Sequence, residues 1–111
     1  MLPKENRLTK KTDFENIRQN GRYITTSKLF TISFLNKKDE ENPRIGFIVS
    51  KKISTKAVER NKIKRTLREI IRKNISYMKT GMDYVIIVKP GILHISHDKL
   101  EIELKNVISS I

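Results

Sequence analysis

Residues 44–73 read RIGFIVSKKISTKAVERNKIKRTLREIIRK. The first seven residues are mostly β-branched or aromatic, which predicts a strand over 44–50. From residue 57 to 74 apolar residues recur at helical spacing, which predicts a helix with Ser54 or Thr55 near its N-terminus. At about 100° per residue, four apolar side chains share one face and form the expected buried stripe: Ile63, Leu67, Ile70 and Ile71.

The same stretch holds most of the excess positive charge. Residues 51–73 contain ten basic and two acidic residues, a net charge of +8, whereas the whole chain carries +12. A second arc of the predicted helix gathers cationic and amide side chains: Asn61, Lys64, Arg65, Arg68 and Arg72. Like charges three or four residues apart repel, so this arc favours an anionic partner, most commonly nucleic acid. A membrane surface, an acidic protein or a merely solvated helix are the alternatives.

Two further helices are expected near the ends of the chain. The first begins at a capping box made by Thr12 and Glu15 and ends just before Gly21. The last begins near residues 96–98 and has apolar residues at helical spacing: Leu100, Leu104, Val107, Ile108 and Ile111.

Four strands are expected, the first two over residues 23–26 and 29–35. A polar loop follows, so the second strand is expected to pair with the strand over 44–50 as a hairpin. Residues 83–88 form a continuous apolar run, which is typical of a strand buried on both faces. The order α-β-β-β-α-β-α predicts an α+β fold, a two-layer α/β sandwich with a four-stranded mixed sheet.

Length and composition exclude several classes of protein. A chain of 111 residues is expected to form one domain over 1–111, since a domain usually has about 100–200 residues. The chain has no cysteine, which excludes disulfides, thiolate metal sites and a thiol nucleophile. No apolar run approaches the length of a membrane span, and residues 1–7 lack a secretion signal, so we expect no membrane contact and a cytoplasmic location.

No catalytic or metal-binding residue is predicted. His94 and His97 are best interpreted as surface histidines, Asp98 as a carboxylate at a helix N-terminus, and residues 39–41 as a solvated acidic loop. Phosphodiester hydrolysis needs a metal-held water or a paired acid and base, and the sequence offers no candidate for either. We therefore expect any such chemistry to come from a partner.

The stretch quoted above also has a family likeness. Residues 46–52, GFIVSKK, and residues 57–69, AVERNKIKRTLRE, resemble the signature of the bacterial ribonuclease P protein subunit. The likeness extends over nearly the whole chain, including NRL at residues 6–8 and YVIIVKP at residues 84–90. In that family the helix carries an Arg-Asn-Arg motif, which here reads Arg-Asn-Lys at residues 60–62.

The resemblance implies the protein subunit of a ribozyme that removes the 5′ leader from precursor tRNA. The implied partners are the catalytic RNA and precursor tRNA, with no obligate protein partner, and Mg²⁺ held mainly by the RNA and not tightly by the protein. The residues implied to bind the RNA subunit lie on the basic stretch: Lys51, Lys52, Arg60, Asn61, Lys62, Lys64, Arg65, Arg68 and Arg72. The residues implied to line a leader cleft between the first helix and the sheet are Phe14, Arg18, Phe30, Ile32, Phe34 and Lys89. The resemblance also implies a left-handed crossover between the third and fourth strands, against the usual right-handed rule.

Several alternatives stay open. Arg60 and Asn61 can each serve the RNA or the local structure. Arg18 stands where the family often has an aromatic residue, and the three apolar residues of the second strand alternate as core residues do. Phe14 is therefore the aromatic residue favoured for the leader. A structural RNA-binding protein of the ribosomal type would share the basic helix without a cleft, whereas a stand-alone nuclease lacks candidate residues.

Overall fold

The computed structural model describes residues 2–111 and contains four strands and three α-helices in the expected order. The strands are β1 (Arg22–Ile24), β2 (Phe30–Asn36), β3 (Arg44–Ile48) and β4 (Met82–Val88). The α-helices are α1 (Lys11–Asn20), α2 (Ala57–Lys73) and α3 (His97–Ser109). Short 3₁₀ turns join them: η1 (Lys4–Asn6), η2 (Ile75–Tyr77) and η3 (Pro90–His94). The predicted α+β fold with a mixed sheet is confirmed.

The strands lie in the order β1-β2-β4-β3, so the predicted hairpin between the second and third strands is wrong. Strand β4 lies between them, antiparallel to β2 and parallel to β3. The loop between β2 and β3 therefore has to pass the end of a strand that comes later in the chain. Because β4 occupies the centre of the sheet, it is buried along nearly all its length, as its continuous apolar run predicted.

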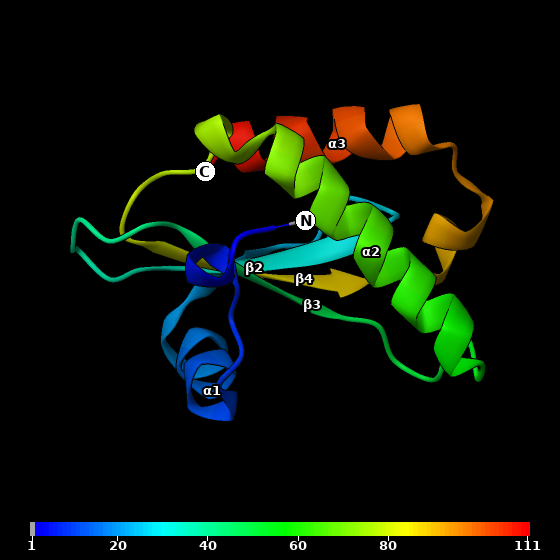
Figure 1. The fold of residues 1–111 in the computed structure, drawn as a ribbon, viewed down its shortest axis with the longest axis horizontal. Coiled ribbons are helices and arrows are strands. Elements are labelled where there is room, and N and C mark those ends of the chain that lie inside the picture. The colour runs from blue at the N-terminus through cyan, green and yellow to red at the C-terminus, as the bar shows by residue number, and fades with distance from the viewer. Residues whose placement is uncertain (1) are drawn as a thin grey trace.

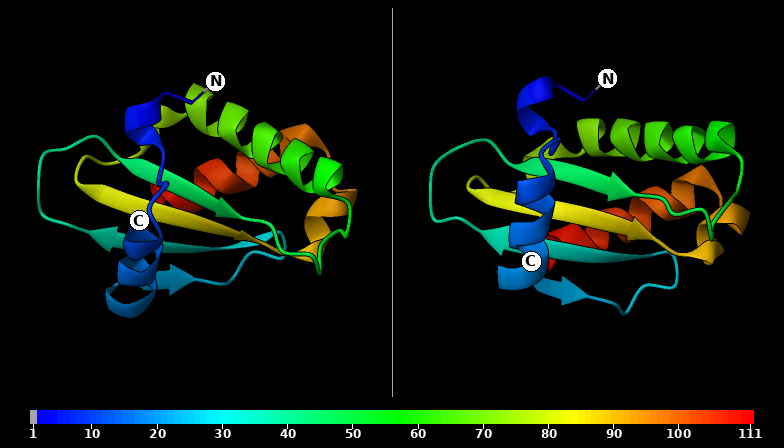
Figure 2. Two further views of the ribbon diagram at one scale, coloured as in Figure 1. Left: turned by 60° about the horizontal axis from the view of Figure 1, so that its bottom comes forward. Right: turned by 90° about the horizontal axis from the view of Figure 1, so that it is seen from below.

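The connection from β3 through α2 to β4 turns left-handed. In the right-hand view of Figure 2, β3 and β4 point the same way and α2 returns behind them, with β4 lying below β3. A chain that moves in this direction around the sheet makes a left-handed turn, which is the rare exception among parallel crossovers. The expectation drawn from the family resemblance is confirmed.

The two faces of the sheet are covered unequally. Helices α2 and α3 pack on one face, whereas α1 crosses only part of the other (Figures 1 and 2). The main core lies under α2 and α3, where Phe30 and Ile32 meet the buried residues of both helices. A smaller cluster of Leu8, Ile17 and Val85 holds α1. Much of the α1 face of the sheet is therefore open.

The helix ends agree only partly with the sequence. The predicted capping box is wrong: α1 begins at Lys11 with Lys10 as its cap residue, so Thr12 lies inside the helix and makes no capping hydrogen bond. Helix α3 begins as predicted, and the Ser96 hydroxyl accepts a hydrogen bond from the Lys99 amide at 3.3 Å. Within residues 2–111, none of the helices has the length and apolar character that a bilayer span requires.

Helix α2 offers a direct test of the packing. Leu67 on its inner face has no exposed surface, whereas Val58 on the same helix is 79% exposed. We expect Leu67→Ala to lower the free energy of unfolding by about 2–5 kcal/mol, because it leaves a cavity against the sheet. Val58→Ala should change it by less than about 0.5 kcal/mol. Urea denaturation of both variants measures the difference, and equal effects would contradict the observed orientation of α2.

Candidate nucleic-acid interface

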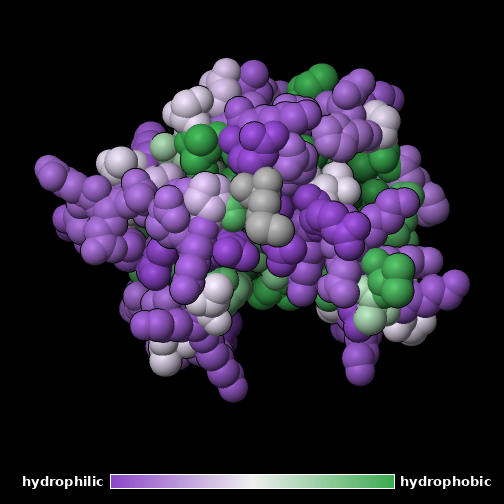
Figure 3. Space-filling model, viewed as in Figure 1, coloured by the Kyte–Doolittle hydropathy of each residue, from purple (hydrophilic) through white to green (hydrophobic). Residues whose placement is uncertain are grey.

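The outer face of α2 and the segment before it carry cations that lie apart from the carboxylates of residues 2–111. Lys51, Lys52, Lys62 and Arg65 are exposed, and Lys64 and Arg68 are half-buried. Among residues 2–111, none of these six side chains has a carboxylate oxygen within 4.0 Å. Hydrophilic side chains cover this helix in Figure 3. The arrangement is a row of free positive charge over several helical turns, which suits a phosphate backbone.

Two arginines of the same helix have partners within the chain. The Arg60 guanidinium donates to the Ser54 carbonyl at 2.9 Å and so fixes the entry into α2. Arg72 hydrogen-bonds and pairs with Glu69, and this contact lowers the pKa of the Glu69 carboxyl. Asn61 is exposed, and no hydrogen bond of its side chain occurs within residues 2–111. The structure thus favours a structural role for Arg60, whereas the Asn61 side chain remains available to a partner.

A groove runs between α1 and the open face of the sheet. Its floor is formed by Ser33, Val85, Ile87 and Ile48, which belong to β2, β4 and β3. One wall is α1, with four side chains directed to the groove: Phe14, Glu15, Ile17 and Arg18. Its volume is about 160 Å³, and Figure 3 shows the hollow between α1 and the segment that joins β3 to α2, with apolar surface at its base.

The Phe14 ring lies directly on the backbone of β3. A Cβ atom placed on Gly46 would come within 2.4 Å of the Phe14 ring and 3.2 Å of Leu8. Any side chain at residue 46 would therefore displace the Phe14 ring, so glycine is the residue that allows this contact. The contact leaves Phe14 half-buried, with a fixed base and part of its surface directed into the groove.

Four of the residues expected in the cleft lie elsewhere. Phe30 and Ile32 have no exposed surface and belong to the core on the opposite face, so they cannot line a groove. Phe34 points to the same opposite face and packs against that core. The Lys89 ammonium donates to the backbone carbonyls of Thr25 at 3.0 Å and Ser27 at 2.7 Å, which ties down the loop before β2. Only Phe14 and Arg18 of the expected set line the groove.

The residues that form the floor of the groove could have been predicted from the alternation of side chains along the strands. Side chains of a strand point alternately to the two faces of the sheet. Because Phe30, Ile32 and Phe34 face the core, the residues between them in β2, such as Ser33, must face away from it. The residues that the sequence analysis missed are those of the α1 face: Ser33, Ile48, Val85 and Ile87. Knowing that α1 covers the face opposite α2 would have selected them.

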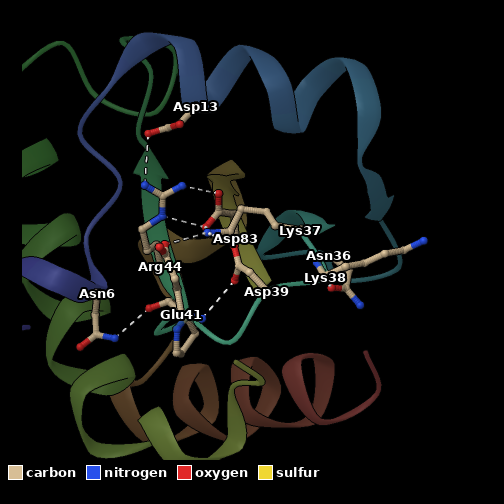
Figure 4. Close-up of polar contacts among 10 residues, drawn as sticks. Asn6, Asp13, Asn36, Lys37, Lys38, Asp39, Glu41, Arg44 and Asp83 are labelled. Atoms are coloured by element: carbon tan, nitrogen blue, oxygen red, sulfur yellow. Dashed lines mark hydrogen bonds and ion pairs between the residues drawn. The ribbon is translucent and has the colours of Figure 1, made fainter. Parts of the chain in front are cut away.

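A network of charged groups anchors α1 beside the groove (Figure 4). Asp83 at the start of β4 is only 2% exposed and accepts two hydrogen bonds from Arg44 of β3, at 2.9 and 2.7 Å. The Arg44 guanidinium also reaches Asp13 of α1 at 3.3 Å. The Lys37 ammonium lies 3.6 Å from Asp83 on another side. The hydrogen bonds that Arg44 donates to Asp83 raise the pKa of Arg44, and burial of the guanidinium opposes this rise.

This network links three elements through one guanidinium. Asp83 in the sheet holds Arg44 by a two-pronged contact, and Arg44 holds the first turn of α1 through Asp13. The negative Asp13 also suits the N-terminal end of a helix, where the backbone dipole is positive. The position of α1, and so the width of the groove, depends on this contact together with the small apolar cluster.

The groups considered for metal binding form no cluster of three or more possible ligands within residues 2–111. His94 and His97 are exposed, and the His97 Nδ1 atom lies 4.0 Å from a Glu101 oxygen. Asp39 and Glu41 lie around the Lys37 ammonium, at 3.5 and 3.8 Å. These acidic residues thus form part of the charged network around β4.

Comparison with known proteins gives one consistent result. The family model described as Ribonuclease P matches residues 2–111. A protein named Ribonuclease P protein component from Dictyoglomus turgidum is 45% identical over 90 residues, covering 81% of this chain and 73% of that protein. A protein of the same name from a Cyanothece strain is 34% identical and covers 98% of this chain and 94% of that protein.

Solved structures show the same likeness in three dimensions. The RNase P protein from Thermotoga maritima superposes with a TM-score of 0.85 at 28% identity, over 95% of this chain and 96% of that one. The RNase P protein from Staphylococcus aureus gives a TM-score of 0.82 at 30% identity, over 95% of this chain and 94% of that one.

The Arg44–Asp83 contact leads to a stability prediction. We expect Asp83→Asn to lower the free energy of unfolding by about 3 kcal/mol. This value is at the lower end of the range for breaking a buried ion pair, because the Arg44 side chain keeps some access to water. Glu15→Gln removes the exposed contact with Arg18 on α1 and serves as the matched control, with no measurable loss. Chemical denaturation compares the two, and a stable Asp83→Asn protein would refute the anchoring role.

Proposed function

Because the chain belongs to the ribonuclease P protein family, we propose that it is the protein subunit of a ribonuclease P ribonucleoprotein and assists removal of the 5′ leader from precursor tRNA. The family implies an RNA partner, and the proposal assigns a separate surface to each of two RNAs. The observation that carries it is the presence, on one small molecule, of a free cationic helix face and a separate groove with an aromatic wall.

The face of α2 is the proposed contact with the catalytic RNA. Its free cations can neutralise successive phosphates, and releasing the counterions of those phosphates drives binding. Arginine contributes more than charge here, since its planar guanidinium binds phosphate in a bidentate manner and stacks on unpaired bases. Of the four arginines of α2, Arg65 and Arg68 make neither an ion pair nor a side-chain hydrogen bond within residues 2–111, so we assign them the main contacts.

The groove beside α1 is the proposed site for the single-stranded leader. Proteins hold single strands by cationic grooves combined with aromatic faces on which bases stack. Phe14 supplies the aromatic face, and Arg18 supplies a cation at the wall. The exposed pairing of Arg18 with Glu15 at 2.7 Å is weak in water, so a phosphate can compete for the guanidinium.

We propose that the bond cleavage itself is carried by the RNA subunit with Mg²⁺. Mg²⁺ prefers oxygen ligands in octahedral geometry and commonly binds substrate phosphates. The side chains assigned to the RNA contact are lysines and arginines, which attract phosphate and repel a divalent cation, together with one neutral asparagine. On this proposal the protein positions the RNA and the leader and neutralises their charge.

Reconstitution tests the proposed function. The chain is mixed with a transcribed ribonuclease P RNA and a precursor tRNA at low Mg²⁺, where we expect cleavage at the mature 5′ end to be faster than with the RNA alone. Cleavage by the chain alone would identify a stand-alone nuclease and overturn the proposal. Binding to the RNA without any effect on cleavage would favour the structural RNA-binding alternative.

The charge on α2 predicts the salt dependence of binding. If about five to seven phosphates are neutralised, log K for the RNA subunit should fall with log[salt] with a slope of roughly −4 to −6. Arg65→Ala should weaken binding and reduce the magnitude of that slope by about one. Lys38→Gln removes one charge from the β2–β3 loop and is the matched control. Equal slopes for the Arg65 variant and the unmodified chain would exclude this face.

The aromatic wall predicts a loss of leader preference. In the complex with the RNA subunit, Phe14→Leu keeps an apolar side chain on Gly46 but removes the stacking face. We expect it to lower the affinity for precursor tRNA by about 1–3 kcal/mol, with the affinity for mature tRNA unchanged. Thermal unfolding shows whether the fold is kept. An intact leader preference in this variant would mean that Phe14 only fills space.

A further inference from the structure

Tyr23 of β1 is a large aromatic side chain left in solvent, with 70% of its surface exposed. Its neighbours in the strand, Arg22 and Ile24, lie opposite Phe34 and Ile32 and so point to the α2 and α3 face. Tyr23 lies opposite Ser33, which is a floor residue of the groove. The ring is therefore on the same face of the sheet as the groove.

The pairing register places Tyr23 at the end of a line across all four strands. Tyr23 pairs with Ser33, Ser33 with Val85, and Val85 with Gly46, on which the Phe14 ring lies. Neighbouring strands are about 4.8 Å apart, so the line is about 14 Å long. Stacked nucleotides of one strand are about 3.4 Å apart, so rings at the two ends would contact different nucleotides.

Arg18 is the cation that lines the groove together with Ser33, the cross-strand partner of Tyr23. No Asp or Glu occurs between Glu15 and Asp39. Glu15 is the single carboxylate among the described residues that line the groove, and it is paired with Arg18. An exposed aromatic ring on the same face of the sheet as a cationic groove wall and a largely apolar floor matches single-stranded nucleic acid.

We propose that Tyr23 is a second stacking contact for the precursor tRNA leader, one that extends the groove to the β1 edge of the sheet. This inference rests on the proposed function. Helix α2 follows β3 in the chain and lies behind the β3 side of the sheet, so β1 is the edge remote from the proposed RNA-subunit contact (Figure 2). Phe14 then contacts leader nucleotides nearer the cleavage site, and Tyr23 contacts nucleotides farther upstream.

The order of the two rings predicts a dependence on leader length. Affinities are measured for the chain bound to its RNA subunit, with precursor tRNAs whose leaders are shortened stepwise from about ten nucleotides to one. Tyr23→Ala should weaken binding of the long-leader substrate roughly 5- to 100-fold and leave the shortest leader and mature tRNA unaffected. Tyr23→Phe keeps the ring and should bind as the unmodified chain does.

Controls separate this inference from its premise. Tyr77→Ala removes another exposed tyrosine, away from the groove, and should leave the length dependence unchanged. If the unmodified complex does not prefer precursor to mature tRNA, the proposed function fails. If that preference exists and Tyr23→Ala binds long leaders normally, or loses affinity equally for mature tRNA, the assignment of Tyr23 is overturned. Thermal unfolding confirms that each variant is folded.

Discussion

The buried carboxylate of Asp83 constrains the architecture around it. A charge that is almost fully removed from water has to be paired and hydrogen-bonded, and Arg44 provides both through two contacts. This requirement fixes β3 beside β4 in parallel register, with Arg44 directly opposite Asp83. The remaining guanidinium nitrogen reaches Asp13, so the same pair also sets where α1 crosses the sheet. The groove exists because α1 is held there and covers no more of that face.

The two faces of the sheet separate the residues that form the core from those that line the proposed binding groove. Period-two alternation sends one set of side chains into the core under α2 and α3, and the other set to the open face. Substitutions of exposed residues on the open face are therefore expected to alter the proposed binding surface with little effect on the core. Helix α2 repeats this division, since its apolar stripe faces the sheet and its cations face solvent. Gly46 contributes both to the packing of α1 and to the proposed groove, because it lets the Phe14 ring approach the backbone of β3.

Much of this could be predicted from the sequence where the signal is local. The stripe of α2, the Ser96 cap and the buried run of β4 follow from spacing within one element. The strand order could not be predicted, because the insertion of β4 between β2 and β3 depends on contacts distant in sequence. The Arg44–Asp83 pair was missed for the same reason. The family resemblance implied that apolar residues of β2 line the groove, but their alternation is that of core residues. The helices cover their face and leave Ser33 on the open one.

The central claim is that two surfaces contact two different RNAs, and crosslinking in the assembled complex tests it most directly. Because the chain has no cysteine, Ser33→Cys and Arg65→Cys each provide a unique attachment point for a short photoreactive group. With the RNA subunit and precursor tRNA bound, the group at residue 33 should crosslink to the 5′ leader and the group at residue 65 to the RNA subunit. A residue 33 group that crosslinks to the RNA subunit and never to the leader would contradict the account.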